Sequence, residues 1–198
     1  RRASDPSLPK NYTRILNLDM VRARYSPFAF GDKFLLYQFW VWKNDSPARE
    51  HLWGLLAVHD GTTWAASGPG RFKKELTEFG WDDRIRFIPY WRKGTGITVT
   101  SDVQPVVASG WTRGTKQLLI LVVNDSDRRA NAQLKVDHQR FGYTSERLSA
   151  QLHPHGGLQG TAEGTSTTRS VESGKALDLT IPPRSWQLVR WLDASSVE

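Results

Sequence analysis

The chain has 198 residues, 38% of which are hydrophobic, and nine of them are tryptophan. This composition excludes an intrinsically disordered chain, the lack of any apolar run of about 18 residues excludes a membrane-spanning helix, and the lack of cysteine excludes disulfides and cysteine–zinc sites. The formal net charge is +7, but the basic residues are scattered in pairs rather than gathered in one block, so we expect neither a nucleic-acid nor a membrane partner.

The first part of the chain, residues 1–93, mixes strand and helix patterns. The run 34–42 is almost continuously apolar and aromatic between polar turns, which predicts a strand covered on both faces, as in a parallel sheet. Ser46 and Pro47 have the residue types of a helix N-cap and a first helical position, and they predict a helix over residues 47–58.

A second helix and a second strand are expected to follow. Apolar residues at helical spacing predict the helix over residues 69–79, and Gly80 is a natural stop for it. Alternation of polar and apolar residues predicts the strand over residues 84–91. The order strand, helix, helix, strand fits the last units of an α/β barrel, although a complete barrel needs about 250 residues.

The second part, residues 94–198, shows short strand patterns separated by turns and no helix pattern. The strands are expected at residues 97–100, 106–111, 117–123, 130–136, 149–153, 166–171, 176–181 and 186–192. The glycine-rich stretch 156–165 is expected to be a long mobile loop. We therefore expect an α+β chain that is mainly β: a short α/β segment over residues 1–93, the end of a barrel, followed by an antiparallel β-sandwich over residues 94–198.

Three stretches resemble the C-terminal region of glycoside hydrolases. Residues 106–126 are similar to the strand and turn that open the C-terminal β-sandwich of several of these enzymes, and residues 179–189 are similar to their last hairpin. Residues 86–91 resemble the junction between barrel and sandwich in large bacterial proteins related to glycoside hydrolase family 123. The resemblance implies a secreted carbohydrate-active hydrolase with a TIM-barrel catalytic domain, of which this chain is a C-terminal fragment or a subunit. It also implies a partner, namely an N-terminal chain or segment that completes the barrel.

Glycoside hydrolysis needs two carboxyl groups that face each other across the scissile bond. The acidic candidates in the first part are Asp45, Asp60, Asp82 and Asp83. Asp82 and Asp83 are adjacent and cannot both face one pocket from a strand, so a helix-to-strand turn with a cap is the better interpretation. We expect the catalytic carboxylates to lie outside this chain.

Two pairs of residues are candidates for substrate binding. Trp40 and Trp42 share one face of the predicted strand and can stack on a sugar ring, although packing in a core or an interface is the favoured alternative. His59 and Asp60 stand together at a helix end and can bind a sugar hydroxyl, although a plain C-terminal turn is the favoured alternative.

No metal and no cofactor are expected. His153 and His155 are separated by one residue, but no third ligand stands at a useful spacing. We therefore interpret them as part of a surface turn.

The leading hypothesis is the C-terminal part of a carbohydrate-active enzyme, with a sandwich that supports the catalytic domain and with a poly- or oligosaccharide as ligand. The chain opens without an apolar signal segment, which leaves a cytosolic protein or a processed piece, and the resemblance favours an extracellular or periplasmic location. The alternative is a non-catalytic carbohydrate-binding or self-assembling extracellular protein. A binding module predicts a planar row of exposed tryptophans, whereas the second part offers Trp111, Trp186 and Trp191, the last two on opposite faces of one strand.

Overall fold

The computed structural model describes residues 17–25, 35–36, 46–63, 75, 77–80, 82–157 and 165–193. Its first part contains helix α1 (Leu18–Tyr25), strand β1 (Leu35–Leu36), helix α3 (Ser46–Ala57) and strand β2 (Thr62–Thr63). None of the helices in the described part of the chain is long and apolar enough to cross a bilayer.

Strands β1 and β2 pair in parallel, with Leu35 opposite Thr62, and α3 connects them along the chain. Parallel neighbours need such a crossover, because a tight turn reverses the chain direction. The predicted helix over residues 47–58 is confirmed, and it begins at Ser46. Of the strand predicted over residues 34–42, β1 is seen and the remainder lies outside the described residues.

The second helix, predicted over residues 69–79, is described only at its end. Glu75 and residues 77–79 are helical, and Gly80 follows with a φ of 81°, a left-handed conformation that glycine adopts without strain and that commonly ends helices. The described residues therefore agree with the predicted stop at Gly80.

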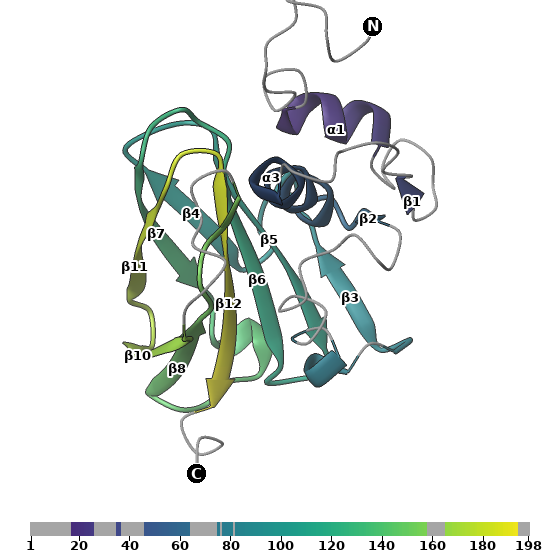
Figure 1. The fold of residues 1–198 in the computed structure, drawn as a ribbon. Helices are drawn as coiled ribbons and strands as arrows, with labels where there is room; N and C mark the ends of the chain where they lie inside the picture. Colours follow the sequence, from purple (N-terminus) through teal and green to yellow (C-terminus); the bar gives the residue numbers. More distant parts are fainter. Residues whose placement is uncertain are drawn as a thin grey trace, which may run out of the picture.

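The second part forms two antiparallel sheets that pack face to face (Figure 1). The larger sheet has the order β10-β8-β12-β6-β5-β3, and the short strand β9 also pairs with β12. Its strands are β3 (Ile85–Ile88), β5 (Val106–Arg113), β6 (Leu118–Asn124), β8 (Arg147–Leu152), β9 (Gly156–Gly157), β10 (Thr167–Glu172) and β12 (Ser185–Asp193). The smaller sheet has the order β11-β7-β4, formed by β4 (Ile97–Ser101), β7 (Ala130–Val136) and β11 (Ala176–Ile181).

The predicted mainly-β character and the eight predicted strands of the second part are confirmed, with ends that shift by one or two residues. The interpretation of residues 156–165 as one continuous loop is wrong at its start. Gly156 and Gly157 form β9 and pair with Trp186 and Ser185, because a chain without side chains can approach β12 closely at that point.

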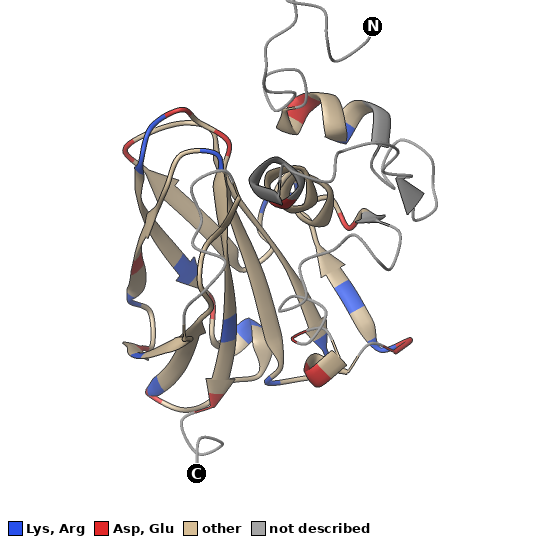
Figure 2. Cartoon of the chain, in the orientation of Figure 1, with Lys and Arg blue, Asp and Glu red and all other residues tan. Residues whose placement is uncertain are grey.

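Strand β6 explains why the fold has two cores. All seven of its residues are buried, and successive side chains point to opposite faces of the sheet. Leu118, Ile120 and Val122 enter the core between the two sheets. Leu119, Leu121 and Val123 enter a second core on the other face, which helices cover. Figure 2 shows this central strand without a charged residue.

The second core joins the first part of the chain to the sandwich. It contains apolar residues of α1 and α3 together with residues of β5, β6 and β12. Strand β3 precedes the predicted boundary at residue 93, but it pairs with β5, with Ile88 opposite Gly110. The large sheet is therefore built from residues on both sides of that boundary.

Candidate functional site

The candidate site is the junction, which we define as the contact of α1, α3 and the helical residues Glu75 and 77–79 with the large sheet. Its apolar part is fully buried and consists mainly of Leu18, Val21, Leu55, Leu56, Val58, Trp111, Leu119, Leu121, Val123, Trp186 and Leu188. Most of the buried polar side chains described below also lie here. The junction therefore combines a hydrophobic interface with specific polar contacts.

Trp186 is at the centre of the apolar part. Its indole N–H donates to the backbone oxygen of Glu50 on α3 at 2.7 Å, and its ring lies 5.2 Å from that of Trp53. Gly54 on α3 and Gly156 on β9 bracket the indole so closely that a methyl group at either position would overlap it. Both glycines are thus required for close packing around one tryptophan.

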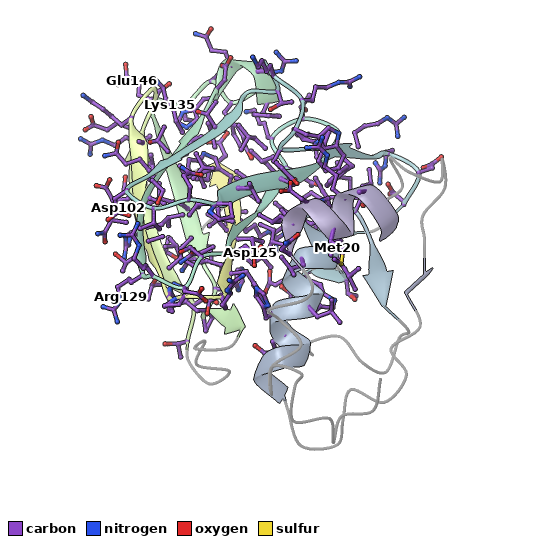
Figure 3. The ribbon with its side chains drawn as sticks, turned by 90° about the horizontal axis from the view of Figure 1, so that it is seen from above. Met20, Asp102, Asp125, Arg129, Lys135 and Glu146 are labelled. Atoms are coloured by element: carbon purple, nitrogen blue, oxygen red, sulfur yellow. The ribbon has the colours of Figure 1, made fainter. Side chains whose placement is uncertain are left out.

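Asp125 forms the first polar cluster, at the turn between β6 and β7. Its carboxylate accepts hydrogen bonds from Nη1 of Arg184 at 2.6 Å and from the backbone N–H of Leu18 at 3.1 Å, and Nε2 of His51 lies 3.2 Å away. Figure 3 shows Asp125 beside α1 and α3. A carboxylate at the first residue of α1 also interacts favourably with the helix dipole. Asp125 therefore ties α1, α3 and the β11–β12 turn together.

His59 forms the second cluster, at the end of α3. Nδ1 lies 2.6 Å from the backbone oxygen of Leu55, so Nδ1 carries the proton and Nε2 accepts a hydrogen bond from the Tyr90 hydroxyl at 3.0 Å. The imidazole also stacks on Trp91, with the ring centres 5.5 Å apart. Burial lowers the pKa of His59 to about 4, so this side chain is neutral at pH 7.

Asp60 follows in a left-handed conformation, with a φ of 60°, and Oδ1 accepts a hydrogen bond from the Trp111 indole at 2.9 Å. Beside it, the Ser109 hydroxyl donates to the backbone oxygen of Val58 at 2.7 Å. The structure thus brings His59 and Asp60 together at a helix end, where protein groups occupy the two His59 nitrogens and Oδ1 of Asp60. A sugar contact by this pair stays a prediction.

The neutral state of His59 predicts a pH dependence of folding. Between pH 6.5 and about 4, His59 takes up a proton in the unfolded chain but not in the folded protein, so its contribution falls by up to about 1.4 kcal/mol per pH unit as the pH falls. His59→Gln lacks this group, so the gap between its stability and that of the natural protein should narrow on acidification and stay constant above pH 7. Urea unfolding at pH 7, 6 and 5 measures this, and two parallel curves would contradict it.

His153 forms the third cluster, and here the prediction of a surface turn is wrong. The side chain is only 4% exposed, because its backbone N–H pairs with the oxygen of Leu188 at 2.9 Å and helical residue Glu75 covers its ring. Nε2 lies 3.3 Å from a Glu75 carboxylate oxygen, and Nδ1 lies 3.0 Å from the Ser166 hydroxyl. His153 therefore lies within the junction rather than on a turn in solvent.

The acidic candidates show no catalytic pairing among the described residues. Asp82 accepts hydrogen bonds from Arg84 at 2.6 Å and Arg113 at 2.7 Å, and the first of these partners is the main cause of a pKa well below the usual range. Asp83 is exposed, and residues 82–84 form a bend and turn between helical residues 77–79 and β3, so the predicted helix-to-strand turn is confirmed. Asp45, Trp40 and Trp42 lie outside the described residues.

No described group of three or more histidine or acidic side chains could hold a metal ion. The polar clusters of the junction each contain a single histidine, namely His51, His59 or His153.

Comparison with known proteins gives no match: no family model matches the chain, and neither the curated proteins nor the solved structures contain a similar one. What the protein does must therefore be inferred from its own residues and contacts. These describe a β-sandwich that is joined, through a buried interface, to a βαβ unit.

Proposed function

We propose that this chain is the C-terminal part of a glycoside hydrolase, in which the β-sandwich supports an α/β-barrel catalytic domain. A preceding chain or segment completes the barrel and supplies the catalytic carboxylates. The protein acts on a poly- or oligosaccharide outside the cytoplasm.

The parallel β1–α3–β2 unit is the observation that carries the proposal. Parallel strands occur almost only in sheets with covered faces, and the two strands that the described residues contribute to this sheet have little stability of their own. Repetition of this unit is what builds an α/β barrel. The unit therefore fits the end of a larger sheet better than a complete domain.

The burial of α3 supports the same interpretation. Every residue from 51 to 59 is buried, whereas a helix at a protein surface normally exposes one side. The sandwich covers one side of α3 through Trp186 and Leu121, and α1 contacts it as well. A barrel helix between the barrel strands and an outer domain has this kind of environment.

The direction of the strands distinguishes the two candidate pairs for substrate binding. Trp40 and Trp42 come four and six residues after β1 in the sequence, and α/β barrels bind substrate at the carboxyl ends of their strands. His59 and Asp60 precede the amino end of β2, on the opposite side of such a barrel. Sugar stacking is therefore proposed for Trp40 and Trp42, and a structural role for His59 and Asp60.

The size of the native polypeptide tests the proposal. An antibody raised against the sandwich should detect a protein much larger than 22.5 kDa in the extracellular or periplasmic fraction of the source cells. The purified protein should release sugar from a panel of chromogenic glycosides, and substitution of an upstream barrel carboxylate should abolish that release. A native polypeptide of 22.5 kDa that is a stable monomer would overturn the proposal.

The non-catalytic alternatives make different predictions in the same experiment. A carbohydrate-binding module needs exposed aromatic rings, but Trp111, Trp186 and Trp191 of the sandwich are each at most 2% exposed. A self-assembling protein would show a denatured mass of 22.5 kDa and a native mass that is a multiple of it.

A further inference from the structure

A cleft of about 280 Å³ lies where the turn after β3 meets the β5–β6 hairpin and the 3₁₀ helix η2 (Gln139–Phe141). Arg92 and Arg140 line it, together with three threonines and the apolar side chains of Ile88 and Phe141. We refer to it as the arginine cleft. It belongs to the sandwich and is separate from the polar clusters of the junction.

The two arginines give the cleft an unbalanced positive charge. Among the residues that the structure describes, no aspartate or glutamate lines it. Within the described part of the chain, neither guanidinium makes an ion pair, whereas Arg113 and Arg184 each pair with an aspartate. The nearby Asp137 accepts the backbone N–H of Arg140 and does not line the cleft. Guanidinium groups without a carboxylate partner favour the binding of an anion.

One of the arginines is held in place by packing. Gly96 has a φ of 88°, and a side chain there would overlap Cδ of Arg140 and approach the ring of Phe141. The aliphatic part of Arg140 therefore lies directly on the backbone at Gly96. This contact restricts the side chain before any ligand arrives, which lowers the entropy that binding must remove.

The remaining lining suits a sugar ring. Ile88 and Pro89, which are partly exposed, offer apolar contact to the C–H face of a pyranose, while Thr112 and Thr115 offer hydroxyls to its rim. The volume of about 280 Å³ is just below the range for small-molecule sites, about 300–1,000 Å³, so the cleft accommodates one sugar unit rather than a long segment.

We propose that the arginine cleft binds one anionic sugar residue of a saccharide chain through its carboxylate or sulfate group. Arg92 and Arg140 hold the anion, with the planar donors that suit either oxyanion, and the apolar wall holds the ring. That the ligand is a saccharide rests on the proposed function, whereas that the ligand is an anion rests on the two arginines alone. The cleft would then retain the enzyme on an acidic polysaccharide while chemistry proceeds elsewhere.

Calorimetric titration of the intact protein tests this with four probes: trigalacturonate, a sulfated galactotriose, neutral galactotriose and inorganic sulfate. At least one charged trisaccharide should bind about tenfold or more tightly than the neutral one. The double variant Arg92→Ala/Arg140→Ala should lose that preference. The matched control Arg128→Ala/Arg129→Ala removes the same charge from the exposed β6–β7 turn and should keep it.

The possible outcomes distinguish a carboxylate from a sulfate as the bound anion. They also test separately whether the ligand is an anion and whether it is a saccharide. Preference for trigalacturonate identifies a uronate, and preference for the sulfated sugar identifies a sulfate. Equal binding of neutral and charged trisaccharides, or equal loss in both double variants, would overturn the inference. If inorganic sulfate bound as tightly as the charged sugars, the inference that the ligand is a saccharide would be overturned. Each of these results is independent of the native polypeptide mass, which tests the proposed function.

Discussion

Trp186→Ala is expected to lower the free energy of unfolding by about 3–5 kcal/mol, the usual cost of removing a large aromatic side chain from a packed interior. The side chain is fully buried, and its loss leaves a cavity between Trp53 and Gly156 and removes the donor to the backbone oxygen of Glu50. Because these contacts belong to the junction, we expect α3 to lose its protection while the core between the sheets persists. Urea unfolding gives the total loss, and native-state hydrogen exchange locates it.

Trp191→Ala is the matched control, since Trp191 is also fully buried on β12 but faces the other core. It packs 5.8 Å from His138, and its backbone oxygen accepts the Tyr143 hydroxyl at 3.0 Å. Its loss should be of similar size, about 3–5 kcal/mol, but should raise exchange in β7 and β11 rather than in α3. If both variants raise exchange in the same strands, the two cores are not separate.

The opposite orientation of these two tryptophans could be read from the sequence, because it follows from the two-residue period of a strand. The same period gives β7 and β11 without error, where Leu134 and Leu179 face inwards and Gln133 and Asp178 face solvent. The prediction succeeds for these strands because the alternation of apolar and polar residues indicates both a strand and the face of it that is buried.

The surroundings of strand β6 cannot be predicted from residue spacing. The run of apolar residues at 118–123 predicts a strand, but periodicity cannot say what covers each face of it. Its second face is covered by α3, which lies more than 60 residues earlier in the chain. Such a long-range contact is encoded in shape complementarity, for example between Gly54 and Trp186, and not in any local pattern.

The polar clusters of the junction were missed for the same reason. The sequence around Asp125 indicates a polar turn, and it contains a second aspartate, Asp127, two residues later. The neighbouring residues in the sequence do not indicate which of the two aspartates is buried. The choice depends on Leu18 and His51, which reach Asp125 only in the folded protein. The surroundings of His153 likewise indicate a surface turn, since the partner that buries it, Glu75, is distant in the chain.

Asp125→Ala is expected to destabilise the protein by about 3–5 kcal/mol, measured as the free energy of unfolding in urea. The substitution leaves the largely buried Arg184 without its closest partner and removes the acceptor for the N–H of Leu18. The cost is this large because the buried N–H of Leu18 loses its acceptor and the guanidinium of Arg184 keeps only the exposed Asp127 as a partner. The effect should change little with salt, since a buried pair is weakly screened.

Asp127→Ala is the control for that substitution, because both aspartates bind the same guanidinium. Asp127 accepts from Nε of Arg184 at 3.0 Å, but its side chain is 84% exposed, against 2% for Asp125. Exposed pairs contribute between about 0 and 1 kcal/mol, and salt weakens them further, so this variant should lose little stability at 0.15 M salt. Equal losses in the two variants would contradict the special role of the buried carboxylate, because the exposed Asp127 would then contribute as much as Asp125. A large loss confined to Asp125→Ala would assign the stability of the junction to its buried carboxylate, and so to the contact that holds α1 and α3 against the sandwich.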